Sequence, residues 1–254
     1  MPSSTLRAMP RVALFVPCLT EHFDARAAEA TARLLLHLGV DLDYPRAQTC
    51  CGQPFRTGGD LASAASLARR MDEVFARADA VVTPSASCAA MVRTHYPTIA
   101  GADDLAISGK TFELAEYLLQ ELAFDASTVT WTGAVTYHPS CHGRDLSGRS
   151  DTATLEILSR IPGVTLHPLP SAAQCCGFGG SFATRFADGS VALGKDKLAL
   201  AESTPATTLV ANDSGCRLHL GGLSTRLELK HLAEILAEGL SLMPRRPHLR
   251  GPSA

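Results

Sequence analysis

The chain contains 254 residues with a mass of 26.8 kDa, a length that suits one large domain or two ordinary ones. Its 23 basic and 25 acidic residues leave a net charge of −2, which argues against a surface for nucleic acid or anionic membrane. An apolar fraction of 46% with 19% charged residues excludes a disordered chain, a collagen and a coiled coil. No apolar run reaches the ~18 residues of a membrane helix, so we expect a soluble, cytoplasmic protein without a membrane span.

Apolar runs and stretches of helical periodicity alternate along the chain in two similar series. In the first half, the pattern predicts strands over 11–17, 40–44 and 79–84 and helices over 25–38 and 60–77. In the second half, it predicts strands over 133–138, 164–169 and 207–212 and helices over 151–160 and 190–202. The segment 97–110 is the main irregular internal stretch. Alternation of strands and helices favours an α/β fold with parallel sheets and right-handed crossovers.

The eight cysteines occur in the same order in the two halves. The first set consists of Cys18, the pair Cys50 and Cys51, and Cys88; the second consists of Cys141, the pair Cys175 and Cys176, and Cys216. The pair follows the first cysteine after 31 residues in the first half and 33 in the second, and the last cysteine follows the pair after 36 and 39. This repeat indicates an internal duplication. We therefore predict two pseudo-symmetric Rossmann-like lobes with short parallel sheets, over residues 11–125 and 126–241.

Each cysteine follows a predicted strand or begins a predicted helix. Because loops at the carboxyl ends of parallel strands gather at one edge of a sheet, we expect the four thiols of each half to converge. Structural disulfides are disfavoured, since two cysteine pairs are adjacent in sequence and no export signal is convincing. Four converging thiolates repel one another unless a cation neutralises them.

Zinc and an iron–sulfur cluster are the two candidates for a site of four cysteines. Adjacent cysteines are awkward ligands for one tetrahedral ion, and they suit a larger object that contains several metal atoms. The spacing therefore favours iron–sulfur, with zinc as the alternative. We expect Gly52 and Gly177, which follow the pairs, to let the backbone approach a sulfide core and donate N–H groups to it.

The doubled motif resembles the cysteine-rich CCG family. The resemblance rests on the strings Cys50-Cys-Gly-Gln-Pro54, Pro84-Ser-Ala-Ser-Cys88, Ser140-Cys-His142 and Cys175-Cys-Gly-Phe-Gly-Gly180. The family includes the catalytic subunit of heterodisulfide reductase, a subunit of some succinate dehydrogenases, and iron–sulfur subunits of glycolate and glycerol-3-phosphate oxidases. Within it, the chain is most similar to the lactate utilization protein A group.

The resemblance implies an iron–sulfur subunit of a multi-subunit oxidoreductase that oxidises L-lactate or a similar 2-hydroxy acid such as glycolate. It also implies electron transfer to two partners, a ferredoxin-type iron–sulfur subunit and a third lactate-utilization subunit. The implied cofactor is a 4Fe–4S cluster held by the eight cysteines, with one cluster per lobe as a possibility. An aerobic preparation could hold zinc instead.

The chain departs from the heterodisulfide reductase pattern at two positions. In those relatives each motif ends in C-x-x-C and five cysteines hold a non-cubane cluster, whereas Ser85 and Asp213 stand here at the first position of that ending. Four thiolates are enough for a cubane. A serine or carboxylate oxygen could complete something larger, so the choice between a cubane and a non-cubane cluster stays open.

Two residues beside Cys141 are candidates for acting on a hydroxy acid. Its oxidation needs a base for the hydroxyl proton and a cation for the carboxylate. We consider His142 as the base and Arg144 as the carboxylate clamp. The simpler alternative is that His142 only forms a hydrogen bond with a cluster sulfur or a loop carbonyl.

Two other functions compete with the redox subunit. One is a zinc- or iron-binding structural subunit that positions partner proteins. The other is a thiol–disulfide enzyme similar to heterodisulfide reductase. A dinucleotide site at Gly177-Phe-Gly-Gly180 is rejected, because Phe182 occupies the place of the third glycine.

Overall fold

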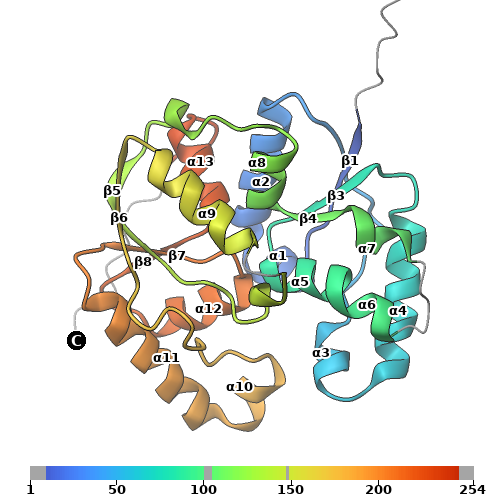
Figure 1. Cartoon of the computed structure of the whole chain (residues 1–254). Coiled ribbons are helices and arrows are strands. Elements are labelled where there is room, and N and C mark those ends of the chain that lie inside the picture. The colour runs from blue at the N-terminus through green and yellow to red at the C-terminus, as the bar shows by residue number, and fades with distance from the viewer. Residues whose placement is uncertain (1–9, 100–104, 147–148, 246–254) are drawn as a thin grey trace, which may run out of the picture.

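A computed structural model describes residues 10–99, 105–146 and 149–245 (Figure 1). Two parallel sheets lie side by side, each with helices packed around it. None of the helices in these ranges is both long and apolar enough to cross a bilayer.

The first sheet has four parallel strands in the order β2-β1-β3-β4. They are β1 (Arg11–Leu14), β2 (Asp41–Asp43), β3 (Ala80–Thr83) and β4 (Thr111–Glu113). The helical segments are α1 (Cys18–Phe23), α2 (Ala25–His37), α3 (Gln53–Thr57), α4 (Leu61–Val74), α5 (Ala86–Ala90), the π-helical turn η1 (Met91–His95), α6 (Tyr96–Ile99), α7 (Ala106–Lys110), α8 (Leu114–Gln120) and the short 3-10 turn η2 (Ala126–Thr128). All of β3 is buried, as expected for a central strand covered on both faces.

The second sheet repeats this topology with the order β6-β5-β7-β8. Its strands are β5 (Thr132–Tyr137), β6 (Gly163–His167), β7 (Thr208–Val210) and β8 (Glu228–Lys230). The helical segments are η3 (Gly143–Leu146), α9 (Arg149–Arg160), α10 (Ser181–Arg185), α11 (Ala187–Glu202), α12 (Ser214–Leu223) and α13 (Leu232–Gly239). The predicted α/β fold of two pseudo-symmetric lobes with short parallel sheets is therefore confirmed.

The sequence patterns missed the fourth strand of each sheet. Strands β4 and β8 have three residues each, too few for a period-2 pattern to stand out. The prediction of an irregular stretch over 97–110 was wrong in its described part, because Ile99 ends α6 and residues 106–110 form α7. Residues 100–104 of that stretch lie outside the described ranges.

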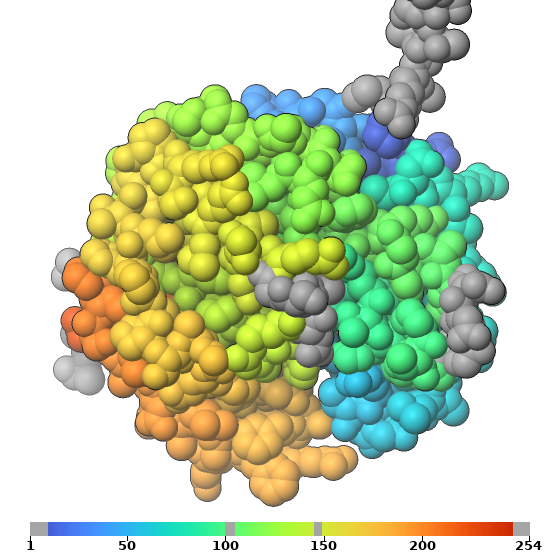
Figure 2. Space-filling model, in the orientation of Figure 1, coloured from blue at the N-terminus to red at the C-terminus, as the bar shows by residue number. Residues whose placement is uncertain are grey.

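The largest apolar core is built from both lobes. Helix α13 packs on α2, and α9 packs on α8, so each lobe contributes one helix to each contact (Figure 1). Figure 2 shows the yellow surface of the second lobe against the green surface of the first. Buried residues of one continuous cluster come from both halves, including Leu34 and Leu118 from the first and Ile157 and Leu236 from the second. The strands of the two sheets fall on either side of residue 125, and the domain boundary there stays a prediction.

Ion pairs of two buried glutamates also cross between the lobes. Glu234 on α13 binds Arg217 of its own lobe and Arg26 of the other. Glu116 occupies the corresponding place on α8 and binds Arg93 of its own lobe and Arg149 of the other. These contacts fix the orientation of the lobes, and therefore the position of one cysteine set relative to the other.

Candidate metal centre

In the first lobe, four cysteines meet beyond the carboxyl ends of β1, β2 and β3. Cys18 begins α1 directly after β1, and Cys88 lies in α5 directly after β3. The pair Cys50 and Cys51 lies in the loop between β2 and α3. The Sγ atoms of Cys18 and Cys50 are 3.8 Å apart, and those of Cys51 and Cys88 are 3.4 Å apart.

The second lobe repeats the arrangement. Cys141 lies in the turn after β5, and Cys216 lies in α12 after β7. The Sγ atoms of Cys141 and Cys175 are 3.9 Å apart, and those of Cys176 and Cys216 are 3.2 Å apart. In each lobe the second cysteine of the pair is buried and the first is partly exposed.

Both cysteine sets line the same cavity, of about 340 Å³. All eight cysteines are among its lining residues, together with α3 and α10 at its edges. The sequence spacing assigned four thiols to each lobe, but it did not indicate that the two sets face each other. That geometry depends on the packing of α2 against α13, which no spacing between cysteines encodes.

The glycine after each pair has a positive φ, +85° at Gly52 and +90° at Gly177. Its backbone N–H points at the first sulfur of the pair, 3.4 Å from Cys50 Sγ and 3.3 Å from Cys175 Sγ. A Cβ on Gly177 would lie 2.5 Å from the Ser190 backbone oxygen on α11. The missing side chain at Gly177 therefore lets the turn pack against this helix. The expected approach of the backbone to a sulfide core, with N–H groups donated to it, stays a prediction.

Ser85 and Asp213 are the N-caps of α5 and α12. The Ser85 hydroxyl accepts a hydrogen bond from the Cys88 N–H, and Asp213 Oδ1 accepts one from the Cys216 N–H. Asp213 Oδ2 accepts hydrogen bonds from the Ser85 hydroxyl and the Ser87 N–H across the lobe boundary. Both carboxylate oxygens of Asp213 are thus engaged in backbone capping and in joining the lobes.

The thiols of each set share protons. A hydrogen bond from Cys18 lowers the pKa of the Cys50 thiol, and the same contact raises the pKa of Cys18. The hydrogen bond between Cys141 and Cys175 acts in the same way, lowering the pKa of Cys175 and raising that of Cys141. Four thiolates this close cannot all ionise without a cation. Four sulfur donors in each set, with N–H groups directed at them, are the kind of ligands that bind a thiophilic metal or an iron–sulfur cluster.

His138 is a member of the second site that sequence reasoning did not single out. It follows β5, is 1% exposed, and has no hydrogen-bond partner at either ring nitrogen among the described residues. One ring nitrogen and the Sγ atoms of Cys176 and Cys216 all lie within 4.8 Å of one another. Burial, followed by the nearby Lys197, lowers the pKa of His138 to about 3, so the imidazole is neutral. The sequence feature that could have indicated His138 is a titratable residue at the end of an otherwise apolar predicted strand.

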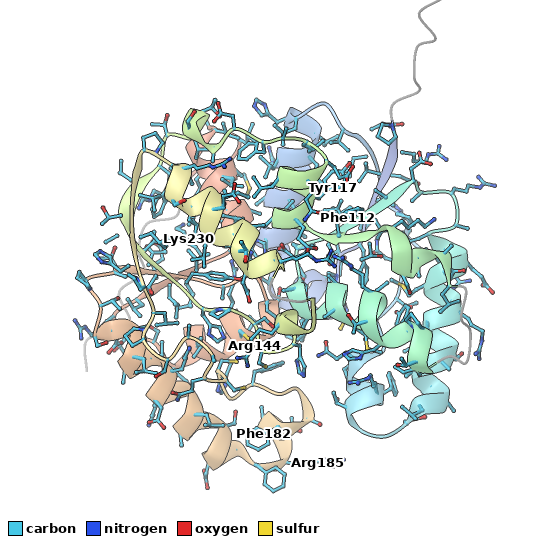
Figure 3. All side chains as sticks on the ribbon, viewed as in Figure 1. Phe112, Tyr117, Arg144, Phe182, Arg185 and Lys230 are labelled. Carbon is cyan, nitrogen blue, oxygen red and sulfur yellow. The ribbon has the colours of Figure 1, made fainter. Side chains whose placement is uncertain are left out.

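The two candidate substrate-binding residues are in different positions. His142 is partly exposed and lines the cavity. Arg144 lies on η3 (Figure 3), is exposed, and is not among the described residues that line the cavity. The roles assigned to them remain predictions.

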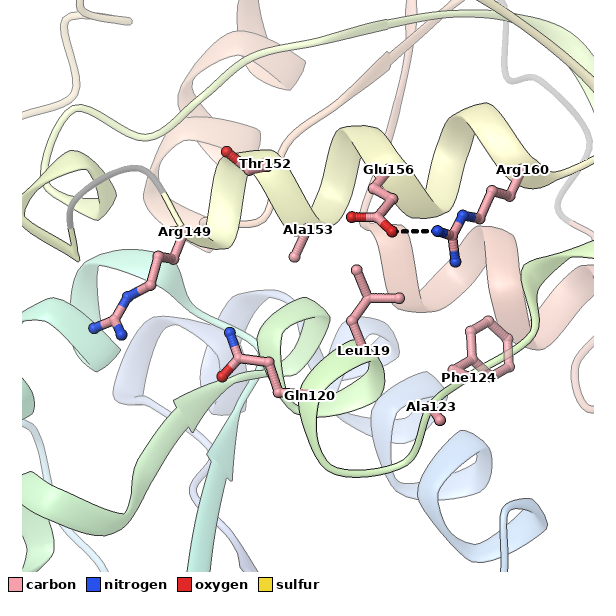
Figure 4. Close-up of a pocket in the computed structure, with 9 residues that line it drawn as sticks. All are labelled: Leu119, Gln120, Ala123, Phe124, Arg149, Thr152, Ala153, Glu156 and Arg160. Carbon is pink, nitrogen blue, oxygen red and sulfur yellow. Dashed lines mark ion pairs between the residues drawn. The ribbon is translucent and has the colours of Figure 1, made fainter.

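A second hollow, of about 460 Å³, lies between α8 and α9 (Figure 4). It contains the ion pair between Glu156 and Arg160, and none of its lining residues is a cysteine or histidine. It is therefore unsuited to a thiophilic metal.

Solved structures resemble the chain only loosely. A glutamate racemase from Bacillus anthracis matches with a TM-score of 0.37 and 16% identity, over 92% of this chain and 80% of that one. An Asp/Glu racemase from Yersinia pestis matches with a TM-score of 0.40 and 10% identity, over 90% and 96%. Likenesses at this level say nothing about the chemistry of this chain.

Sequence relatives are much closer. The CCG cysteine-rich domain matches residues 12–93 and 135–221, one copy in each half. Lactate utilization protein A from Geobacillus kaustophilus (strain HTA426) is 40% identical over 236 residues, which cover 89% of this chain and 98% of that protein. The protein of the same name from Geobacillus thermodenitrificans (strain NG80-2) is 38% identical over the same shares. The chain therefore belongs to the cysteine-rich CCG-domain family, in the group of proteins named lactate utilization protein A.

Proposed function

We propose that the chain is the iron–sulfur subunit of a multi-subunit enzyme that oxidises a 2-hydroxy acid. L-lactate is the leading substrate and glycolate the close alternative. The observation that carries this proposal is the cavity lined by all eight thiols, arranged as two sets with neighbouring sulfurs 3.2–3.9 Å apart. The name shared by the relatives supports lactate as the substrate.

Each cysteine set would hold one 4Fe–4S cluster, which supplies one-electron transfer when bound. The capping roles of Ser85 and Asp213 favour four thiolate ligands in each lobe over a larger ligand set. The N–H groups of Gly52 and Gly177 would stabilise negative charge on the sulfur atoms.

Oxidation of a 2-hydroxy acid to a 2-oxo acid breaks the O–H and C2–H bonds and releases two electrons and two protons. One electron would pass to each cluster, and the C2 proton would pass to water. His142 lines the cavity and would accept the hydroxyl proton, while Arg144 on the adjacent η3 would hold the carboxylate. The electrons would pass to a ferredoxin-type iron–sulfur subunit and a third lactate-utilization subunit in the cytoplasm.

Anaerobic co-expression with these two subunits tests the proposal. We expect a brown complex that contains iron and acid-labile sulfide and reduces a dye when L-lactate or glycolate is added. The matched control is the same complex with Cys51→Ser, which should assemble but lose dye reduction. Activity that persists at full rate without this chain would refute the proposal.

The same experiment separates the two competing functions. A colourless complex with stoichiometric zinc and unchanged assembly would establish a structural subunit. Cleavage of a heterodisulfide without any dependence on a hydroxy acid would establish a thiol–disulfide enzyme.

A further inference from the structure

The two cysteine sets differ at a buried position directly after the strand that precedes the first cysteine. The backbone N–H of Phe15 donates to the Val82 oxygen of β3 at 2.8 Å, and that of His138 donates to the Val210 oxygen of β7 at the same distance. Phe15 and His138 are both three residues before the first cysteine of their set. They therefore occupy equivalent places, and the duplicated fold has an apolar ring in one lobe and an imidazole in the other.

The surroundings of Phe15 are apolar and suit its ring, whereas those of His138 provide no hydrogen-bond partner for its ring nitrogens. The Phe15 ring packs edge-on against Phe75, with ring centroids 5.9 Å apart, in an apolar cluster that includes Cys51 and Cys88. His138 is 1% exposed, and both of its ring nitrogens lack a hydrogen-bond partner among the described residues. Buried polar groups are seldom left without a partner. The unpartnered ring nitrogens of His138 therefore indicate that a bound group completes this site.

The thiols of Cys176 and Cys216 lie close to the unpartnered imidazole, and both are groups that commonly bind metals. One His138 nitrogen and the sulfurs of Cys176 and Cys216 lie within 4.8 Å of one another, and the two sulfurs are 3.2 Å apart. A neutral imidazole with two thiolates is a ligand set for iron, cobalt or zinc, and these metals bind sulfur at ~2.3 Å and nitrogen at ~2.0 Å. Ligand atoms this close reach a common metal atom after small movements of the side chains.

We propose that His138 is a nitrogen ligand of the metal centre at the second site, the centre that Cys176 and Cys216 also bind. At a single ion, Cys141 or Cys175 supplies the fourth ligand to the same atom. In a 4Fe–4S cluster each iron takes one protein ligand, and His138 binds one iron in place of a cysteine. This inference rests on the metal binding in the proposed function and does not depend on the substrate. The metal is a first-row transition ion, either one iron of a cluster or a single divalent ion. The first site, with Phe15 in the equivalent place, has thiolate ligands only.

Mixed ligation makes the two centres chemically different. Imidazole carries less negative charge than thiolate, and replacement of thiolate by imidazole raises the reduction potential of iron–sulfur centres. We therefore expect the second centre to be reduced before the first.

The test uses the full-length chain with ¹⁵N-labelled histidine, loaded anaerobically with Co²⁺ in one arm and with iron and sulfide in the other. Pulsed EPR should detect a histidine nitrogen coupled to a metal centre in the wild-type protein. His138→Phe, which copies the first lobe, should abolish the coupling and weaken Co²⁺ binding at one site by at least about tenfold. Phe15→Leu, the matched control in the other lobe, should change neither readout.

Each outcome of this experiment either supports His138 as a ligand or overturns that assignment. Coupling in the iron–sulfide arm assigns the nitrogen to a cluster, and coupling only in the Co²⁺ arm assigns it to a single ion. Absence of coupling in both wild-type arms overturns the proposal without any variant that needs to fold. Coupling that survives His138→Phe but disappears in His142→Ala also overturns it, because His142 would then be the ligand. If the protein bound zinc and had no redox activity, but its Co²⁺ form showed the coupling to a histidine nitrogen, the proposed function would be refuted and this inference would stand.

Discussion

Two buried side chains near the cysteine set are apolar in the first lobe, whereas the residues at the equivalent positions of the second lobe, His138 and Lys197, are titratable. Phe15 and Met71 share a buried cluster with Cys51 and Cys88. The equivalent of Met71 is Lys197, because α4 and α11 pack in the same way on the turn glycines Gly52 and Gly177. Lys197 is fully buried. Burial lowers the pKa of its ammonium group to about 8, while charge on Cys176 and Cys175 acts in the opposite direction.

The loops that carry the cysteine pairs are also held differently. In the second lobe, Lys197 Nζ donates hydrogen bonds to the backbone oxygens of Ser171 and Ala172, just before the pair. In the first lobe, the neutral amide of Gln48 donates to the backbone oxygens of Leu14 and Pro45. A duplicated scaffold has thus kept the positions of its thiols while changing the charge around them. Because a buried cation stabilises added negative charge, the two sites are not interchangeable.

The largest expected effect comes from removing one buried thiol from each lobe. Cys51→Ser and Cys176→Ser should each lose roughly half of the bound iron, because each lobe holds its own set of ligands. Iron and sulfide analysis after anaerobic reconstitution checks this, with Ser87→Ala as a control on the same cavity wall. If either single variant lost all of its iron, the two sets would belong to one centre and the comparison between lobes would fail.

Exchanging Met71 and Lys197, the equivalent buried residues near the two cysteine sets, tests whether the charge of the lysine makes the two sites different. Met71→Lys places an ammonium group in an apolar cluster, which should cost about 2–5 kcal/mol in the free energy of unfolding. Lys197→Met loses two hydrogen bonds and should cost about 1–2 kcal/mol, while lowering the reduction potential of the second centre. Denaturant unfolding and EPR-monitored redox titration measure the two effects. Equal costs for the two exchanges would mean that the sites do not differ in polarity.

The grouping of the cysteines could be predicted from the sequence because topology limits where they can go. Loops after parallel strands share one edge, so the order of cysteines and strands was enough to place four thiols together. The helix predicted over 25–38 agrees closely with α2 (Ala25–His37), since its apolar repeat runs over several turns. Helices α3 and α10 have five residues each and carry no such repeat, so they were missed.

What the sequence did not reveal depends on contacts between distant segments. The two cysteine sets face one cavity because α2 packs on α13, and Asp213 meets Ser85 for the same reason. His138 could be noticed as a histidine near Cys141, but its burial and its approach to Cys176 and Cys216 depend on the folded second lobe. Such pairings depend on tertiary packing, which local patterns do not encode.

The turn glycines offer a sharper comparison of the two lobes. An alanine at either position must adopt a left-handed conformation, which costs roughly 1–2 kcal/mol. At Gly52 the new Cβ would make only ordinary contacts, the closest at 3.5 Å, whereas at Gly177 it would lie 2.5 Å from the Ser190 oxygen. Gly177→Ala should therefore destabilise the protein by about 1–3 kcal/mol more than Gly52→Ala. Thermal unfolding of the two variants measures the difference, and a larger loss for Gly52→Ala would contradict the packing described for α11.

The smallest effects concern two equivalent N-cap residues with opposite pH dependence. Glu113 caps α8 and His231 caps α13, and both are fully buried. Burial raises the pKa of Glu113 to about 8 from its ordinary 4.5, and burial lowers the pKa of His231 to about 3 from 6.5. The folded state favours protonated Glu113, so its contribution to the free energy of unfolding is complete below pH 4.5 and is lost as the pH rises towards 8. The folded state favours neutral His231, so its contribution is complete above pH 6.5 and is lost as the pH falls towards 3.

Glutamine at each position removes the titration and keeps groups that can form hydrogen bonds. Glu113→Gln should gain about 1–2 kcal/mol relative to the wild type between neutral and mildly alkaline pH, with no such gain in acid. His231→Gln should flatten the loss of stability below pH 6.5. Loss of the hydrogen bond to the Pro84 oxygen should lower the whole curve by a constant amount without adding a slope on the alkaline side. Unfolding free energies measured across this pH range separate the two slopes. If Glu113→Gln changed the acid side instead, the buried carboxyl would be ionised in the folded state, and the assigned direction of its pKa shift would be wrong.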